Sequence, residues 1–474
     1  MLVCYARMIK LLIVFTGCFA LMGLPGWVTP AFARSDAQAF AATLKTKDRQ
    51  AFEAYYQAQV FYQADVDAYW GQVAAKRKKR RAKIRRKQTI STADYVTNFP
   101  PKYDGPKLSK RLARKWKRFK TKPRVSQSKK KPSAIDSLAD FLRAAKRHYD
   151  FTPERISERE FKRRYAREAL RLGLSGEQVV RVYALETGGN GTADMQAGIH
   201  PISKKGRPIS TALGYAQLLA ANSTSELAKH GDGFVRRLRR LAATTNNAQR
   251  RRRLATKIES LRKMVRKAKS IPYSWARHRR FARTGPGMGL HALNLDGDVG
   301  PWLQVIKLRG IKDLAIKNGR RQLSSEQLEL MNLAGPGTGL EMMRRTGLGM
   351  PTANFFARRG YERNSVVRGR TSRQLLSELG RRMDVNARNK GAREFKAIFK
   401  ALEQVAPPAG AAAGRLEPTT YPSPAAANGP TSGDNQWADE AVIRAPVPRP
   451  AQRPARQQAD PLAQRLEFGS RASY

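Results

Sequence analysis

The sequence predicts a mainly α-helical protein with one globular core and strongly basic flanking segments. Between about 136 and 403 apolar residues recur at helical spacing. The formal net charge of +54 on 474 residues is too large for a packed globule to carry evenly, so part of it belongs to extended segments. Beyond 404 the chain is rich in Pro and Ala and lacks the periodicity of a core. We therefore expect one self-supporting core of roughly 250 residues.

The first 33 residues have the three parts of a secretory signal. Arg7 and Lys10 are positive, residues 11–24 are almost wholly apolar, and Ala31-Phe-Ala33 is a typical cleavage site. A transmembrane anchor is the alternative, but Pro25 and Pro30 interrupt the apolar run. We expect a mature chain that begins at Arg34 and is exported to the periplasm or cell envelope.

Both cysteines lie inside this signal. A lipoprotein modified at Cys18 is a weaker interpretation, because Phe15 is a poor residue for a lipobox. With Cys4 and Cys18 removed, the mature chain has no cysteine. We expect no disulfide in the exported protein.

The next two segments differ in composition. Residues 34–75 suit a long helix, with aromatic residues at three- and four-residue spacings. Residues 76–135 contain two dense basic runs separated by a Pro-rich stretch, which predicts a basic, largely disordered linker that binds polyanions by charge. Trp116 and Phe119 lie among its lysines. They either contact a partner or belong to a solvated helix face.

The core is expected over 136–403. Within it, residues 233–270 are strongly basic but keep a thin apolar stripe, which predicts a long helical hairpin leaning on the core. Residues 404–474 are expected to form a disordered Pro/Ala-rich tail.

The segment from Ser175 to Gly189 carries the most information about chemistry. Ser175 and Gln178 have capping-box spacing, and the apolar face of the predicted helix ends in the carboxylate of Glu186. Gly188 and Gly189 then stop the helix. Burial and the negative end of the helix dipole both disfavour the charged form of such a carboxylate, as a general acid requires. The alternative is an exposed Glu at a frayed helix end.

Two later segments complete a family pattern. Glu-Thr-Gly-Gly at 186–189 resembles the Glu-Ser-Gly-Gly motif of soluble lytic transglycosylases, members of the lysozyme-like superfamily. Gly214-Tyr-Ala-Gln-Leu-Leu219 is similar to their Gly-Leu-Met-Gln-Leu motif, and Ala334-Gly-Pro-Gly337 to their Tyr-Asn-Ala-Gly-Pro-Gly motif. The resemblance spans roughly residues 160–365 and implies a lysozyme-like transglycosylase domain over 136–403, with the basic hairpin as an insertion.

The resemblance also implies roles for individual residues. Glu186 matches the single catalytic acid/base, and Gln217 matches the glutamine of the second motif. Asn332 stands where the family has a tyrosine that helps to hold the sugar, and Tyr215 or Tyr361 could supply a hydroxyl instead. These four residues, Tyr215, Gln217, Asn332 and Tyr361, are the expected substrate-binding residues, and the expected structural glycines are Gly188, Gly189, Gly214, Gly335 and Gly337.

The family's chemistry needs one carboxylate. Glu186 would protonate the glycosidic oxygen while the acetamido oxygen of the substrate stabilises the cationic centre. It would then deprotonate the hydroxymethyl group of the same sugar, which closes an anhydro ring. Asp194 is assigned no proton transfer, and Asp296 and Asp298 are interpreted as a turn and helix cap. The five histidines are scattered, so we expect no metal and no cofactor.

The sequence leaves three functions open. The first is a lytic transglycosylase that acts on peptidoglycan glycan strands. The second is a non-catalytic, highly basic protein on a lysozyme-like scaffold that binds wall polymers. The third is a water-using muramidase or chitinase, whose products carry a reducing end. The basic arms are expected to bind anionic envelope polymers in each case. Export and the absence of a recognisable nucleic-acid-binding motif argue against nucleic acid.

Overall fold

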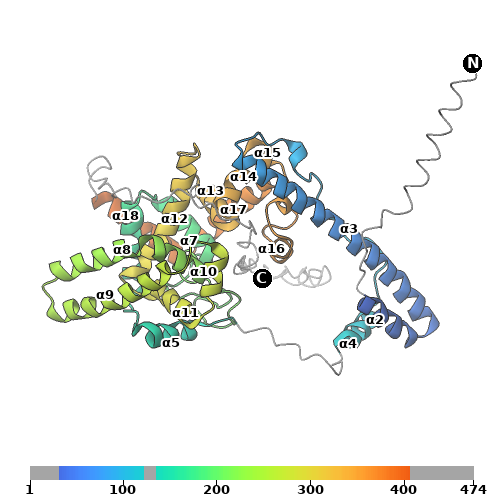
Figure 1. Ribbon diagram of the computed structural model, residues 1–474, viewed down its shortest axis with the longest axis horizontal. Coiled ribbons are helices and arrows are strands. Elements are labelled where there is room, and N and C mark those ends of the chain that lie inside the picture. The colour runs from blue at the N-terminus through green and yellow to red at the C-terminus, as the bar shows by residue number, and fades with distance from the viewer. Residues whose placement is uncertain (1–30, 122–134, 406–474) are drawn as a thin grey trace, which may run out of the picture. The chain divides into compact units, whose positions relative to one another are not determined.

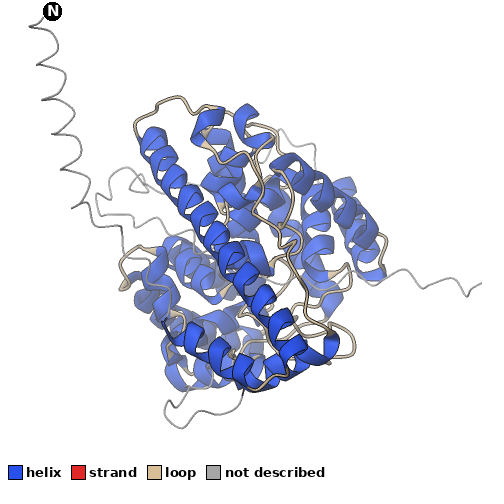
Figure 2. Cartoon of the chain, turned by 90° about the vertical axis from the view of Figure 1, so that its right-hand side faces the viewer, coloured by secondary structure: helices blue, strands red, loops and turns tan. Residues whose placement is uncertain are grey.

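The computed structural model describes residues 31–121 and 135–405, which divide into two compact units (Figure 1). Unit 1 comprises the described residues of 1–75 and 100–132, and unit 2 those of 76–99 and 133–474. The described residues are helices and loops without a named strand, so the mainly α prediction is confirmed (Figure 2). Most of the predicted signal peptide, and the tail beyond 405, lie outside the described residues.

Unit 1 has a small aromatic core of its own. It contains α2 (Ala31–Ala42), the first part of α3 (Thr46–Arg85) and α4 (Lys110–Thr121). Phe40 packs against Phe52 and Trp116, with ring centroids 4.8 and 4.9 Å apart. Trp116 is therefore buried rather than offered to a partner or solvated. The predicted single helix over 34–75 is instead two helices, because the chain turns at residues 43–45.

The basic segment after residue 75 differs from the predicted linker. In unit 2, α3 continues to Arg85, and Arg80 is 1% exposed. The Arg80 guanidinium donates to Glu341, at 2.7 Å, and to the carbonyls of Asp94 and Asn354. Basic side chains on one side of this helix thus find acceptors in the core. Of the segment predicted as disordered, residues 76–121 are ordered, and 122–134 lie outside the described residues.

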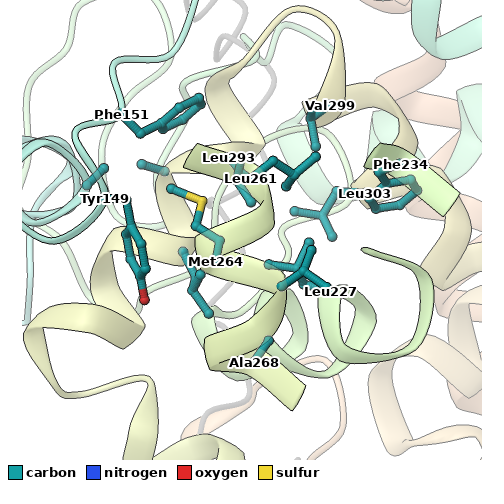
Figure 3. Packing of buried hydrophobic residues seen from close by; sticks show 14 of the residues in the cluster. Tyr149, Phe151, Leu227, Phe234, Leu261, Met264, Ala268, Leu293, Val299 and Leu303 are labelled. Carbon is teal, nitrogen blue, oxygen red and sulfur yellow. The ribbon is translucent and has the colours of Figure 1, made fainter. Parts of the chain in front are cut away.

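The remainder of unit 2 is a helical assembly around the apolar cluster shown in part in Figure 3. Phe234, Leu261, Met264 and Leu303 are among its buried members. Its helices, in chain order, are α5 (Leu138–Tyr149), α6 (Glu158–Arg171), α7 (Gly176–Thr187), α8 (Ala220–Thr244), α9 (Ala248–Lys269), α10 (Trp275–Phe281), α11 (Gly285–His291), α12 (Val299–Lys317), α13 (Ser325–Ala334), α14 (Pro336–Met342), α15 (Arg345–Leu348), α16 (Arg358–Arg363), α17 (Ser372–Ala387) and α18 (Lys390–Val405), with short 3₁₀ helices η1 (Thr92–Asp94), η2 (Ala292–Leu295) and η3 (Thr352–Asn354).

The basic hairpin predicted over 233–270 is present as α8 and α9, which pack side by side (Figure 1). Most of the predicted apolar stripe is buried, but Leu241 near the tip is 40% exposed. Lys257 of α9 is 5% exposed and pairs with Asp296 and Asp298, at 2.9 and 2.5 Å. The expected turn at these aspartates forms, because Asp296 accepts from the Asp298 and Val299 amides. The pair therefore also anchors the hairpin.

No helix among residues 31–121 and 135–405 is long and apolar enough to cross a membrane.

Candidate active site

Helix α7 has the predicted construction. Ser175 and Gln178 form a capping box at its start, and Gly188, at φ +65°, caps its end in the left-handed conformation. Val179, Val182 and Tyr183 are each 1% exposed. Glu186 follows on the same face and is 5% exposed, which excludes the alternative of an exposed carboxylate at a frayed end.

The glycines after Glu186 fit closely against the junction of α17 and α18. Gly189 has φ +73°, and a Cβ there would lie 2.1 Å from the Asn386 carbonyl oxygen. The Gly189 carbonyl accepts from the Ala392 amide at 2.8 Å, and Asn389 donates to the Gly188 carbonyl at 2.8 Å. These contacts fix the loop, and with it the position of Glu186.

The third motif meets the first at Glu186. The side-chain nitrogen of Asn332 donates to Glu186 Oε1 at 3.1 Å and to Glu329 Oε2 at 3.1 Å. Asn332 and Glu329 belong to α13, which ends at Gly335 with φ +85° before α14 begins at Pro336. Gly335 thus has the conformation that favours glycine. A Cβ on Gly337 would meet no atom within 4 Å, so local packing does not require a glycine there.

Glu329 is a buried carboxylate that sequence reasoning did not single out. It is 0% exposed, and it lies three residues before Asn332 on the same helix face. A signal was available, because Glu329 interrupts the apolar run formed by Leu328, Leu330 and Met331. An acidic residue inside such a run indicates a buried partner.

The second motif forms a tight turn beside α7. Leu213 and Leu218 exchange both backbone hydrogen bonds across it, and Gln217 adopts φ +43°. The Gln217 side chain donates to the Gly214 carbonyl at 2.7 Å, so it braces the turn. A Cβ on Gly214 would lie 2.4 Å from the side chain of Gln304, which accepts from the Tyr215 amide. Gly214 also has φ +72°, so the left-handed backbone and the close approach of the Gln304 side chain both favour glycine there.

Tyr215 lies in the interior. It is 1% exposed, its ring lies 5.0 Å from that of Tyr183, and its hydroxyl donates to Glu158 of α6. Burial raises the pKa of Glu158 above its usual value, although the bonds from Tyr215 and the Ala193 amide favour its charged form. The hydroxyl that was expected to hold sugar thus ties the second motif and the loop after α7 to α6.

The other expected groups lie in separate surroundings. Tyr361 of α16 is 4% exposed and accepts from the Gly369 amide at 2.9 Å, within its own loop. Asp194 pairs with Arg155 and Lys204, at 3.0 and 3.2 Å. Burial alone would raise the Asp194 pKa, but hydrogen bonds from Thr192 and Lys204 hold it at about 2. Asp194 is therefore ionised at neutral pH.

Within the described ranges, no group of three or more His, Cys, Asp or Glu residues could hold a metal ion. Comparison with models of protein families, with curated proteins and with solved structures found no match. The arrangement that remains is a buried carboxylate, an amide and a second carboxylate. It is assembled where the first and third motifs meet, and the second motif packs against α7 through the rings of Tyr215 and Tyr183.

Proposed function

We propose that the protein is a peptidoglycan lytic transglycosylase with a lysozyme-like core, in which Glu186 is the catalytic acid and base. The observation that carries the proposal is the hydrogen bond from Asn332 to Glu186. It joins the first and third motifs, which are 146 residues apart in the chain. A direct bond between two motifs so far apart in the chain is better support than the same motifs in sequence order alone.

The surroundings of Glu186 suit a group that gives up and regains a proton. The residue ends an apolar helix face at the C-terminal end of α7, where the helix dipole disfavours a negative charge. As an acid, Glu186 gives its proton to the glycosidic oxygen while the acetamido oxygen of the substrate attacks the anomeric carbon. As a base, it takes the proton of the hydroxymethyl group, whose oxygen then closes the anhydro ring. No water enters the reaction.

Glu329 raises the question of a second catalytic carboxylate. The bonds to one Asn332 nitrogen keep its oxygen within about 6 Å of the Glu186 oxygen, close to the separations found in glycosidases. Glu329 is 0% exposed, however, and it is joined to Glu186 through the side chain of Asn332. A group so enclosed does not flank the sugar or activate a water. This favours the one-carboxylate route over a water-using muramidase.

The decisive experiment measures glycan release by the mature protein from purified peptidoglycan, with mass spectrometry of the products. Glu186→Gln should lower the rate about 100- to 10,000-fold, because the amide can neither give nor take the proton. The protein should still fold, since Gln can accept the bond from Asn332. Products with anhydro ends support the transglycosylase, and products with reducing ends support the muramidase.

Asp194→Asn is the matched control. It also replaces a carboxylate by an amide after α7, but at a residue that is ionised and ion-paired. It should keep most of the activity. A wild type that releases anhydro products at the same rate as Glu186→Gln would refute the role of Glu186.

A non-catalytic wall-binding protein is the second candidate, and one observation favours it. The outward faces of α8 and α9 carry exposed arginine and lysine with no carboxylate within 4 Å among the described residues, including Arg236, Arg239, Arg252, Lys263 and Arg266. If the wild type binds peptidoglycan but releases nothing from it, this function replaces the first.

A further inference from the structure

The two sides of the α8–α9 hairpin treat their basic residues differently. On the inward side, carboxylates of the core meet the cations. Arg237 of α8 pairs with Glu168 at 2.7 Å, and Lys257 of α9 pairs with Asp296 at 2.9 Å. These ion pairs, together with the buried apolar stripe, hold the hairpin in a fixed orientation on the rest of unit 2.

On the outward side, one ion pair shows which residues of the two helices share a face. Asp232 of α8 pairs with Lys269 of α9, so these two residues lie on the same side of the hairpin. Residues that are three, four or seven positions away along a helix lie on the same face. Arg236 and Arg239 follow Asp232 by four and seven residues, and Arg266 precedes Lys269 by three. The three arginines therefore belong to one face, which both helices form.

This outward face has little acid to balance its charge. Asp232 is paired with Lys269, and Glu259 is paired with Arg262 at 3.0 Å. The other basic residues on the face and at its edge are exposed, and none has a carboxylate within 4 Å in the described part of the chain. They are Arg236, Arg239, Arg252, Lys263 and Arg266. Most of them are arginines, whose planar guanidinium matches a phosphate group with two parallel hydrogen bonds.

The cations form a plane rather than a line, because α8 and α9 lie side by side (Figure 1). The axes of packed helices are about 8–10 Å apart. Along α9, the rise from Arg252 to Arg266 is about 21 Å. A single polymer strand can follow one row of cations, whereas a flat anionic surface meets both rows at once. A platform that is already rigid also loses little freedom on binding.

We propose that the outward face of the α8–α9 hairpin binds the phosphate headgroups of an anionic phospholipid membrane. For the exported chain that the sequence predicts, this surface is the outer leaflet of the membrane that the chain has crossed. The contact is electrostatic, and each basic residue near such a surface strengthens binding about fivefold. The inference goes beyond the proposed function, because it requires nothing of Glu186 or of any glycan.

Vesicle binding tests the lipid partner. Residues 34–474 are mixed at physiological ionic strength with vesicles of phosphatidylcholine alone, or of equal parts phosphatidylcholine and phosphatidylglycerol. Bound protein is measured by co-sedimentation. The wild type should prefer the anionic vesicles. Replacing four arginines of the hairpin by Gln should lower its partition coefficient on them about 100- to 1,000-fold. The four are Arg236, Arg239, Arg252 and Arg266.

The matched control removes four charges from the exposed side of α4. It changes Lys110, Arg114, Lys115 and Lys117 to Gln. Because the net charge falls by the same amount, a response to net charge alone would make the two variants equal. The α4 variant should lose far less of its vesicle binding than the hairpin variant.

A fluorescent probe tests the face itself, because it reports contact rather than total charge. Residues 34–474 contain no cysteine, so a single one can be introduced and labelled. Ala243 is exposed and lies three helical turns after Asp232, on the proposed face. Leu241 is 40% exposed, and its position on α8 is about half a turn away from that face. A polarity-sensitive probe on Ala243→Cys should shift its emission to shorter wavelength on anionic vesicles, whereas the same probe on Leu241→Cys should not.

Four results would overturn the inference. They are equal binding of the wild type to both kinds of vesicle, equal losses in the hairpin and α4 variants, equal probe shifts at the two positions, and an Ala243→Cys probe that responds to purified anionic wall polymer but not to vesicles. The last result would assign the face to the polymer. The probe variants carry the test if the hairpin variant does not fold. None of these results decides the proposed function, because release of anhydro products is measured separately.

Discussion

At the scale of single residues, the two glycines after Glu186 are constrained by different features of the structure. Gly188 has φ +65°, but a Cβ there meets nothing within 4 Å. Gly189 has φ +73°, and its Cβ would lie 2.1 Å from a backbone oxygen of Asn386. A side chain at Gly188 would be strained only by the left-handed backbone conformation. A side chain at Gly189 would have the same strain and would also push the loop away from α17.

The two alanine variants should therefore separate in stability. Gly188→Ala should lower the free energy of unfolding by about 1 kcal/mol, the usual cost of a left-handed conformation. Gly189→Ala should lower it by roughly 2 kcal/mol more, because the clash is with backbone and cannot be relieved by a rotamer change. Urea denaturation of both variants measures the difference, and equal losses would contradict the close fit of the loop.

His291 is a buried residue that makes stability depend on pH. It is 0% exposed, and its Nε2 donates to the Thr211 carbonyl at 2.6 Å, so its Nδ1 accepts from Ser223 at 2.8 Å. Burial lowers the pKa of His291 to about 4, although the bond to Thr211 opposes the shift. The unfolded chain takes up this proton near pH 6.5, whereas the folded protein takes it up only near pH 4.

The stability that depends on neutral His291 is therefore complete above pH 6.5 and lost as the pH falls towards 4. The loss attributable to this residue should reach about 3 kcal/mol. His291→Gln keeps a donor for Thr211 but does not titrate, so its free energy of unfolding should fall less steeply over this range. Identical slopes for the wild type and His291→Gln would show that His291 is not the responsible group.

Local patterns were sufficient to predict α7 and its stop. The capping box, the apolar face and the two glycines are all encoded within 15 consecutive residues, from Ser175 to Gly189. The contact between Glu186 and Asn332 could be predicted only through the family resemblance. The buried position of Tyr215 was missed, because it follows from tertiary partners that no local pattern contains. Glu329 was missed although the apolar residues around it, Leu328, Leu330 and Met331, carried a local signal of burial.

At the scale of secondary-structure elements, the last turns of α3 show how a basic run can belong to a core. The density of basic residues predicted a solvated linker. That prediction was wrong for Arg80, because its hydrogen-bond acceptors lie far away in the sequence and cannot be seen in the local pattern. Glu341 is 261 residues distant, and Tyr95 lies beneath the guanidinium at 4.2 Å. Charge density alone does not distinguish a mobile basic segment from a helix whose basic residues on one side bind acceptors in the core.

Breaking the contact between Arg80 and Glu341 should destabilise unit 2. Arg80→Met keeps the length of the side chain but leaves Glu341 without the guanidinium. A buried pair that loses one partner typically costs about 3–5 kcal/mol. Lys79→Met removes the same charge from the exposed neighbouring position and should change the free energy of unfolding by less than about 0.5 kcal/mol. Urea denaturation provides the comparison, and similar midpoints for the two variants would mean that residues 76–85 are not part of the core.

At the scale of the whole molecule, the charge of +54 is distributed unevenly. Part of it is neutralised inside unit 2, as at Lys257 and Arg80. The helix α4 of unit 1 differs, because Trp116 and Leu112 bury its apolar side while basic residues cover the other. Lys110, Arg114, Lys115 and Lys117 are all exposed there. The basic surface for which polyanion binding is predicted is thus a folded platform on α4 rather than a disordered run.

This platform should dominate the salt dependence of binding to anionic wall polymer. Each basic residue that contacts the polymer releases counterions, so the logarithm of affinity falls with the logarithm of salt concentration at a slope that grows with the number of contacts. Changing Lys110, Arg114, Lys115 and Lys117 to Gln should make this slope shallower by about 3 units if all four take part. The core should be unaffected, because all four side chains are exposed.

The matched control removes the same number of charges from the α8–α9 hairpin of unit 2, by changing Arg236, Arg239, Arg252 and Arg266 to Gln. This variant should change the slope less. Equal changes in the two variants would show that the polymer responds to net charge alone and that α4 has no special role.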